Sequence, residues 1–338
     1  MMSQAMLDFI AKVAPGTALR EAIDNIIRAR TGALIVIGGE PDIDEDCEAG
    51  FKLDVPFHHT LVYELAKMDG AILLDADIKK IRRANVELLP KRFAITTETG
   101  MRHRTAERIA RTRDVLVIAI SERRSVVSLY CGSERYLLHD LSYILTKASG
   151  AFASLGRYDR LFRSAARRVQ DTELTGSVPL MDVVELLRRA SMTMKIRQEI
   201  SRYILELGRD GHLIDLQLEE YPDIRREWCW LWKDYQAQND GIPLDPYITD
   251  SDGWSAEEWI QHLGYSALDN MVHPRGYRLL HGIPRLPDSV IDNLIRHYGS
   301  MKALREASVE DLDQVEGVGP QRARAIWNLF HDTVPISQ

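Results

Sequence analysis

The sequence predicts an α/β domain with a mixed sheet covered by helices, then an all-α linker bundle, then an all-α domain with two helical hairpins in tandem. Apolar runs of strand length alternate with helical patterns up to about residue 145, and beyond it the strand signal disappears. After about residue 268 a helix–tight turn–helix pattern occurs twice. Mixed strand and helix patterns are typical of a sheet with helices packed on it. The predicted domains are therefore residues 1–145, 146–267 and 268–338.

Length and charge limit the classes of function. The chain has 338 residues, of which 45% are apolar, and a formal net charge of −7. That length suggests two or three domains, each with enough apolar side chains for a core. An acidic chain does not bind nucleic acid through its overall charge, so any contact with phosphate needs a local basic patch.

Cysteine usage and hydropathy indicate the compartment. Cys47, Cys131 and Cys229 are far apart and fit neither a metal-ligand spacing nor a disulfide framework, which favours a reducing compartment. The N-terminus lacks the features of a signal peptide, and no apolar stretch reaches the roughly 20 residues that span a bilayer. We expect a cytoplasmic protein without membrane contact.

The first domain contains clear strand and helix signals. Thr17 follows Pro15-Gly16 and can cap a helix that ends before Gly32. Four apolar runs read as strands, namely Ala33–Ile37, Ala71–Leu74, 115–120 and 126–130.

The middle domain reads as helices throughout. A long helical pattern covers 142–170 and is expected to break near Gly150 and Gly156, and two further helices are expected at 179–207 and 223–237. The last of these carries three tryptophans at alternate positions, Trp228, Trp230 and Trp232. They fit a bundle core with one ring exposed, and a contact between subunits is the alternative.

Two short signals in the first domain point to chemistry. Asp69-Gly70 stands just before a strand, where Asp-Gly is also common turn chemistry. Arg102-His103-Arg104 stands at the start of a helix whose apolar positions are Ala106, Ile109 and Ala110. A helix N-terminus is already positive, so cations are unfavourable there unless an anion lies opposite.

Two explanations of this basic helix start remain open. A bound phosphate would satisfy the free amides and the guanidinium groups together. Alternatively, Glu107 and other acidic side chains neutralise this face, which also carries Arg108, Arg111 and Arg113. The sequence contains neither a P-loop nor a strand followed by G-x-G-x-x-G, which argues against a P-loop enzyme and an ordinary dinucleotide-binding domain.

Longer motifs make the first domain recognisable. Residues 13–17 read VAPGT, 63–71 read YELAKMDGA, 98–108 read ETGMRHRTAER and 120–124 read ISERR. These segments resemble the DisA family of DNA integrity scanning proteins, which are bacterial diadenylate cyclases. The resemblance runs along essentially the whole chain, and the paired D-G-A and R-H-R motifs are highly specific to diadenylate cyclase domains. Many cyclases of the wider family have Thr where this chain has Met101, so the resemblance implies one weakened hydroxyl contact beside the pocket with the chemistry retained.

The resemblance implies a nucleotidyltransferase that joins two ATP molecules into cyclic di-AMP with release of two pyrophosphates. Catalysis of this kind depends on positioning and charge neutralisation. Asp69 would hold a divalent metal, Mg²⁺ or Mn²⁺, and orient the attacking 3′-hydroxyl. Gly70 would let the nucleotide approach the backbone, and Leu88 would line the adenine or ribose wall.

The resemblance also implies how the phosphates are held. His103 would lie near the reacting or leaving group. The remaining ATP-binding residues would be Met101, Arg102, Arg104, Thr105, Ser121 and Arg124. Glu122 is either part of the triphosphate site or part of a plain turn at the end of a strand. A product with two-fold symmetry needs two facing half-sites, so the active form would be a dimer through the first domain, and the family assembles as an octamer.

The last domain contains one glycine-rich turn. Residues 312–326 resemble a helix-hairpin-helix motif, in which the amides of Gly317, Val318 and Gly319 could bind a DNA backbone phosphate and Arg322 and Arg324 could add contacts. Four residues have the spacing of its packed face, namely Leu312, Val315, Ala323 and Ile326.

The other hairpin differs. Ile283-Pro-Arg-Leu-Pro287 has no glycine pair and its prolines lack amide donors, so it reads as the structural copy, although Arg285 could touch a phosphate. For the glycine-rich hairpin, DNA binding is the favoured interpretation, and a packed helical pair without DNA is the alternative.

Two functions from different classes fit the sequence. The first is a cyclase regulated by branched or Holliday-junction DNA in a DNA-damage checkpoint, associated with the nucleoid. The second is a DNA-binding scanning protein whose first domain only senses nucleotide. Intact Asp69 and Arg102-His103-Arg104 favour the enzyme.

Overall fold

The computed structural model describes residues 2–90, 94–237 and 253–331. The chain forms two compact units. Unit 1 consists of Met1–Gly150 with Glu199–Glu219, and unit 2 of Ala151–Gln198 with Glu220–Gln338. A segment of the linker region that lies far along the sequence therefore folds together with the first region of the chain.

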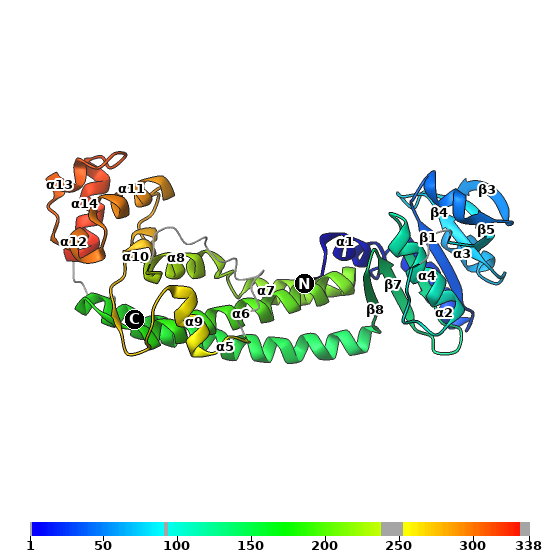
Figure 1. Ribbon diagram of the computed structural model, residues 1–338, viewed down its shortest axis with the longest axis horizontal. Coiled ribbons are helices and arrows are strands. Elements are labelled where there is room, and N and C mark those ends of the chain that lie inside the picture. The colour runs from blue at the N-terminus through cyan, green and yellow to red at the C-terminus, as the bar shows by residue number, and fades with distance from the viewer. Residues whose placement is uncertain (1, 91–93, 238–252, 332–338) are drawn as a thin grey trace. The chain divides into compact units, whose positions relative to one another are not determined.

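Unit 1 contains a mixed sheet (Figure 1). Its strands are β1 (Ala33–Ile37), β2 (Cys47–Glu48), β3 (Phe51–Pro56), β4 (Ala71–Leu74), β5 (Lys80–Leu88), β6 (Leu116–Ile120), β7 (Val127–Cys131) and β8 (Glu134–Leu138). In the described residues the order is β2-β5-β4-β1-β6-β7-β8, and β3 pairs with β5. The pair β1 and β4 is parallel, and the other pairs are antiparallel. Its helices are α1 (Gln4–Lys12), α2 (Ala18–Arg28), η1 (Asp42–Asp46), α3 (His59–Leu65), α4 (Met101–Thr112), η2 (Gly208–Gly211) and α7 (His212–Glu219).

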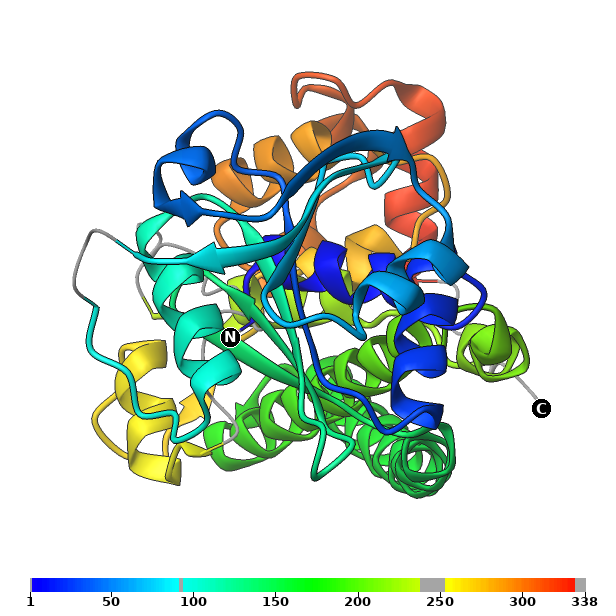
Figure 2. The same ribbon diagram turned by 90° about the vertical axis from the view of Figure 1, so that its right-hand side faces the viewer.

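Each face of the sheet has its own core. Ile35 and Ile37 pack into a cluster with α1, α2 and α3, whereas Leu34 and Val36 pack into a cluster with α4. Successive side chains of a strand point to opposite faces, so β1 is apolar at every position. Figure 2 shows α2 (dark blue) and α4 (teal) on opposite sides of the sheet. The predicted mixed sheet covered by helices is therefore confirmed.

The strands and the helix cap that were predicted for unit 1 are confirmed, but some strands were missed. The four predicted strands correspond to β1, β4, β6 and β7 within one residue at each end. The Thr17 hydroxyl accepts a hydrogen bond from the amide of Arg20 at 3.2 Å and caps α2, as predicted. The strands β3, β5 and β8 were not predicted, because charged side chains interrupt their apolar pattern.

The linker region contains two long helices, α5 (Leu141–Thr175) and α6 (Leu180–Leu207). The prediction that the first breaks near Gly150 and Gly156 is wrong, because α5 runs through both glycines. A helical glycine costs only about 1 kcal/mol relative to alanine. Burial of residues such as Phe162 and Val169 of α5 in the core of unit 2 outweighs that cost. No helix in the described ranges is both long and apolar enough to cross a membrane.

Unit 2 adds shorter helices and a two-stranded sheet. Its remaining elements are α8 (Arg225–Tyr235), α9 (Ala256–Leu263), β9 (Val178–Pro179), β10 (Met271–Val272), α10 (Tyr277–His281), α11 (Asp288–Tyr298), α12 (Met301–Glu306), α13 (Val309–Asp313) and α14 (Pro320–His331). Trp228 and Trp232 are buried in the bundle core, as predicted, and the Trp228 indole N–H donates to the Ser191 hydroxyl at 3.0 Å. Trp230 is half-buried rather than exposed, and its ring stacks on His281 at 3.9 Å.

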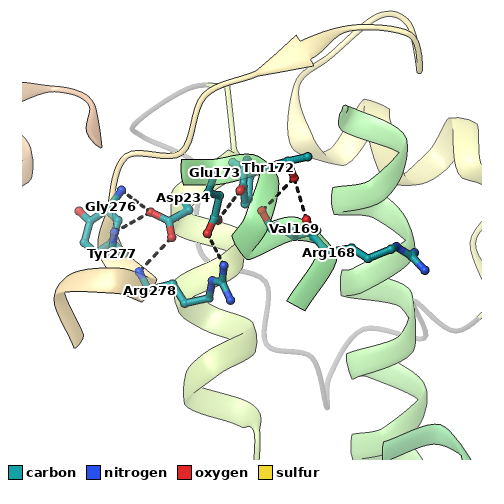
Figure 3. A network of polar contacts seen from close by, with 9 residues as sticks. Arg168, Val169, Thr172, Glu173, Asp234, Gly276, Tyr277 and Arg278 are labelled. Carbon is teal, nitrogen blue, oxygen red and sulfur yellow. Dashed lines mark hydrogen bonds and ion pairs between the residues drawn. The ribbon is translucent and has the colours of Figure 1, made fainter. Parts of the chain in front are cut away.

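A buried polar network fastens the first hairpin to the bundle (Figure 3). The Asp234 carboxylate of α8 accepts hydrogen bonds from the amides of Gly276, Tyr277 and Arg278, at 2.8, 2.6 and 2.9 Å. These amides surround the N-terminus of α10, so Asp234 supplies the cap that this helix lacks locally. The Arg278 guanidinium in turn pairs with Glu173 of α5, which is also buried.

Candidate functional site

One edge of the sheet in unit 1 gathers the predicted nucleotide residues. The parallel strands β1 and β4 both begin at this edge, and β6, which is antiparallel to β1, ends there. In the register, Ala33 pairs with Ile120 and Leu34 pairs with Ala71. Gly70 and Ser121 are therefore brought to the same end of the sheet although they are far apart in the sequence.

A cavity of about 780 Å³ opens at this edge. That volume lies in the range of small-molecule sites. Its lining is rich in charge of both signs. The lining residues are Asp69, Gly70, Glu98, Thr99, Gly100, Met101, Arg102, His103, Ile120, Ser121, Glu122, Arg123, Arg124, Val126, Arg135 and Leu137.

Asp69 and Gly70 form the bend that leads into β4. The Asp69 side chain is fully exposed to solvent, and one carboxylate oxygen lies 4.0 Å from the Arg102 guanidinium. Gly70 has a φ of +88°, and a Cβ there would lie 2.8 Å from backbone atoms of Asn85 and Val86. Only glycine fits such a conformation at such a close approach. The Asp-Gly turn is therefore also part of the candidate site, because this bend places Asp69 at the cavity.

The N-terminus of α4 supplies free amides to the cavity. Gly100 is the N-cap and makes no side-chain cap, and the first amide that bonds back to it is that of Arg104, at 2.9 Å. The amides of the three preceding residues have no acceptor within the helix, which is the usual anion-binding arrangement. Arg102 extends from this turn toward Glu122, 3.4 Å away.

His103 sits against a polar wall of the cavity. Glu98 accepts a hydrogen bond from the Tyr130 hydroxyl at 3.0 Å and pairs with Arg135 at 2.7 Å, and the His103 ring meets the Tyr130 ring edge-on at 6.4 Å. Burial lowers the pKa of His103 below its ordinary value; Glu98 raises it, and Arg135 lowers it further. The lowered pKa favours the neutral imidazole of His103 in the free protein.

Acidic neutralisation, one of the two explanations of the basic face of α4, accounts for its far end. Arg111 pairs with the buried Glu107 at 2.7 Å, and Arg113 pairs with Asp46 and Glu45. Acidic neighbours thus neutralise these two arginines near the end of the helix. At the start of the helix, the ion pairs of Arg102 with described residues are the longer ones to Asp69 and Glu122, and the cavity lies beside it.

The structure brings most of the predicted residues together and leaves three apart. Leu88 is 7% exposed and packs into the core beneath α4 instead of lining the cavity. Arg104 contacts the sulfur of Met101 at 3.7 Å, and neither it nor Thr105 lines the cavity. The residues that do line it are Asp69, Gly70, Met101, Arg102, His103, Ser121, Glu122 and Arg124.

Several lining residues were not predicted. Glu98 and Arg123 stand inside the recognised motifs without an assigned role, whereas Arg135 and Leu137 come from the unpredicted strand β8. A signal for β8 was present, because Gly132-Ser133 joins β7 and β8 through a two-residue loop and Gly-Ser is a hairpin pair. Arg123 and Arg124 make no ion pair with any described residue and are exposed at the cavity.

The donor set limits how a metal could bind. Among the described residues, no group of three His, Cys, Asp or Glu side chains is placed to hold a metal ion. Asp69 offers one exposed carboxylate beside the cavity. Mg²⁺ commonly binds one or two carboxylates together with substrate phosphates and water, so this arrangement fits a metal that arrives with a nucleotide.

The hairpins in unit 2 form a second candidate site. Both turns close with the same bond, from the Val318 amide to the Val315 carbonyl at 2.9 Å and from the Leu286 amide to the Ile283 carbonyl at 3.4 Å. The third residue of each turn has a positive φ, +85° at Gly317 and +62° at Arg285. The predicted packed face is confirmed, since Leu312, Val315, Ala323 and Ile326 are buried.

The second hairpin retains one amide that the first hairpin lacks. Gly319 retains an N–H where the first hairpin has Pro287, and the carbonyl of Gly319 begins α14 by accepting from Ala323 at 2.9 Å. Arg324 is exposed, while one guanidinium nitrogen of Arg322 donates to the Gly317 carbonyl at 2.7 Å and braces the turn.

Comparison with known proteins agrees with this architecture. Residues 20–135 match a family model described as "DisA bacterial checkpoint controller nucleotide-binding". Residues 138–267 match the model of the "DisA bacterial checkpoint controller linker region". Residues 278–336 match the model of the helix-hairpin-helix motif. The DNA integrity scanning protein DisA of Carboxydothermus hydrogenoformans is 44% identical over 94% of this chain and 93% of its own length. Its counterpart in Bacillus licheniformis is 43% identical over 96% of this chain and 93% of its own. With the sheet-edge cavity in unit 1 and the paired hairpins in unit 2, the chain belongs to the DisA family.

Proposed function

We propose that the chain condenses two ATP molecules into cyclic di-AMP and two pyrophosphates. In each half-reaction, a ribose 3′-hydroxyl attacks the α-phosphate of the other ATP, and pyrophosphate leaves. The observation that carries the proposal is the pairing, across one cavity, of the exposed Asp69 carboxylate with the basic start of α4. A carboxylate and an anion-binding helix end are the two parts that such a transfer requires.

The residues divide into those that act on the hydroxyl and those that hold phosphate. Asp69 orients the 3′-hydroxyl and takes up its proton. The free amides of α4 and Arg102 hold the phosphates, and His103, whose lowered pKa favours the neutral imidazole before the nucleotide binds, can donate a hydrogen bond or accept a proton near the leaving group. Arg123 and Arg124 neutralise the departing pyrophosphate.

A divalent cation, Mg²⁺ or Mn²⁺, would be held by Asp69 and the phosphates. When bound, it would neutralise charge on the α-phosphate and lower the pKa of the hydroxyl. The remaining work falls to the residues above, which fix the two groups in line.

The symmetry of the product supports a dimer. One cavity holds one nucleotide, so closing the ring needs a second copy whose cavity faces the first. The full exposure of Asp69 suits this assembly, because the carboxylate must reach a hydroxyl that approaches from outside its own cavity. The octamer that the family resemblance implies would contain such dimers.

We further propose that the second hairpin binds backbone phosphates of branched or Holliday-junction DNA, which would associate the protein with the nucleoid. The amide of Gly319 and the exposed Arg324 support this, since such contacts read phosphate position rather than base sequence.

A product assay tests the reaction. Full-length protein is incubated with ATP and Mg²⁺ or Mn²⁺, and the nucleotides are separated by chromatography. We expect one cyclic di-AMP for every two pyrophosphates, no product from Asp69→Asn, and unchanged junction-DNA binding by that variant. Asp77→Asn is the matched control, because Asp77 is also exposed, pairs with the neighbouring Lys79 at 2.9 Å and is not among the cavity-lining residues. ATP binding without any cyclic product from the wild type would instead make the first domain a nucleotide sensor.

A further inference from the structure

A buried carboxylate from the linker region lies under the nucleotide domain. Glu206, near the end of α6, is fully buried within unit 1. One of its oxygens accepts a hydrogen bond from the Tyr136 hydroxyl at 2.5 Å, and the other accepts from the amide of His139 at 2.8 Å. Both partners belong to β8 or to the residue just after it. A buried carboxylate keeps such partners because an unpaired one is costly.

The two faces of β8, the strand that Glu206 contacts, lie against different parts of unit 1. Tyr136 and Leu138 pack against the core formed with α1, α2 and α3. Arg135 and Leu137 alternate with them and line the nucleotide cavity. Because the backbone between them is continuous, the position of Tyr136 determines where Arg135 emerges.

The position of Arg135 in turn affects the residues that form the cavity wall. Its guanidinium pairs with Glu98 at 2.7 Å, and Glu98 also accepts from the Tyr130 hydroxyl, whose ring packs edge-on against His103. Glu98 stands two residues before Gly100, the N-cap of α4. A continuous set of contacts therefore runs from α6 through β8 to the phosphate-binding end of α4.

The two ends of β8 are held by different parts of the chain. At its start, Glu134 accepts hydrogen bonds from the Ser3 amide at 3.0 Å and the Ser3 hydroxyl at 2.8 Å, which lie just before α1. At its end, Glu206 is the partner. Only the second anchor comes from the linker region, which continues through α6 into unit 2.

We propose that Glu206 is a positioning residue for the nucleotide cavity, acting through Tyr136 and β8 on Arg135. The affinity for nucleotide then depends on how α6 is held, and the linker can transmit a change in unit 2 to the reacting groups. This inference rests on the cavity being the nucleotide site of the proposed cyclase. Beside Glu206 lies the His139 ring, with Nδ1 3.4 Å from a carboxylate oxygen, and Arg202 of the same helix acts on the Tyr136 hydroxyl that Glu206 accepts from.

The test measures binding of 3′-deoxy-ATP, which lacks the attacking hydroxyl and therefore binds without turnover. Full-length Tyr136→Phe loses the hydroxyl and leaves a Glu206 oxygen unpaired. We expect its dissociation constant to rise roughly fivefold or more, the usual lower range of coupling between sites. Glu206→Gln should retain most of the affinity, because an amide can accept from the His139 amide and donate to a reversed Tyr136 hydroxyl.

Two comparisons separate positioning from general destabilisation. Tyr203→Phe is the matched control, since the Tyr203 hydroxyl donates to Glu199 of the same helix at 2.6 Å and, among the described residues, makes no hydrogen bond to β8. Arg135→Gln should weaken binding by itself, and adding Tyr136→Phe to it should cause no further loss. A destabilised fold would instead give losses that add up.

A measurement on the wild type covers the case in which Tyr136→Phe fails to fold. Coupling is reciprocal, so 3′-deoxy-ATP should slow hydrogen exchange at the end of α6 around Glu206. Unchanged exchange there, or additive losses in the double variant, overturns the inference and leaves the cyclase proposal standing. Absence of cyclic di-AMP together with normal 3′-deoxy-ATP binding removes the cyclase and leaves the positioning role intact.

Discussion

A methyl group at Gly32 should disable the site without changing any charged residue. Gly32 stands just before β1, and a Cβ there would lie 2.3 Å from a terminal nitrogen of Arg102 and 3.1 Å from the Ile120 carbonyl oxygen. Ordinary contact begins at about 3.4 Å, so the guanidinium nitrogen must move by roughly 1 Å. Arg102 approaches both Asp69 and Glu122, so this movement displaces the group that we propose holds the phosphates.

The magnitude follows from the geometry. A displacement of about 1 Å in a reacting constellation can cost about 100-fold in rate, or roughly 2.7 kcal/mol. The fold should tolerate the substitution, because Gly32 is not in the left-handed region and alanine at such a position changes the free energy of unfolding by only about 1 kcal/mol. Gly32→Ala should therefore lose about two orders of magnitude in cyclic di-AMP formation while its melting temperature moves by a few degrees.

The assay compares product formation and thermal unfolding in two glycine variants. Gly150→Ala is the matched control, because nothing lies within 4 Å of the place in α5 that its added methyl group would occupy, and it should be slightly more stable and fully active. Wild-type turnover by Gly32→Ala would refute the reasoning that the present position of Arg102 is required. A large loss of stability in Gly32→Ala would show that the Ile120 carbonyl, and not the guanidinium, takes the strain.

Three further predictions concern protonation, DNA and the hairpin anchor. Burial lowers the pKa of His103 and a bound triphosphate would raise it, so nucleotide affinity should increase as the pH falls through this pKa. Calorimetry should show that the protein takes up a proton when the nucleotide binds. After correction for the titration of the nucleotide itself, this proton uptake should be absent in His103→Gln. Gly319→Pro introduces the proline of the first hairpin and deletes one amide, so junction-DNA binding should weaken about tenfold. Titrations at several salt concentrations should give the same dependence of affinity on salt as the wild type, and a changed dependence would point to a lost charge contact. Burial raises the pKa of Asp234 to about 6 from 3.8, so the folded chain binds this proton more tightly than the unfolded chain. The contribution of Asp234 to the free energy of unfolding therefore grows as the pH falls from about 7 to 4, by at most about 3 kcal/mol. In urea unfolding across that range, Asp234→Asn should lack this dependence on pH, and an identical dependence in the variant would contradict the assignment.

The fold class and the main site motifs could be read along the chain because they rest on short-range patterns. The runs that form β1 and β4 are apolar at every position, since both faces of these strands are buried. The Thr17 cap and the basic start of α4 need only neighbouring residues. The glycine turn of the second hairpin is local in the same sense, because a positive φ such as that of Gly317 favours glycine.

Where prediction failed, contacts distant in sequence outweighed local preference. Gly150 and Gly156 were expected to break a helix, but packing of α5 in unit 2 carries it through both. Leu88 was placed at the nucleotide by resemblance, whereas in the structure it pairs with Cys47 of β2 and packs into the core under α4. The strand β8 was missed because its side chains are mixed in polarity, one face serving the core and the other the cavity.

By itself the sequence determined an α/β domain with a cation-rich helix start, a helical linker and two hairpins, since each follows from residues within a few positions of one another. Only the tertiary structure decided that Asp69 faces Arg102 across a cavity, that Arg135 and Glu98 complete its wall, and that Glu206 holds the strand beneath it. Tyr136 and Glu206 are 70 residues apart. Such contacts depend on strand register and on where a long helix returns, which no local pattern encodes.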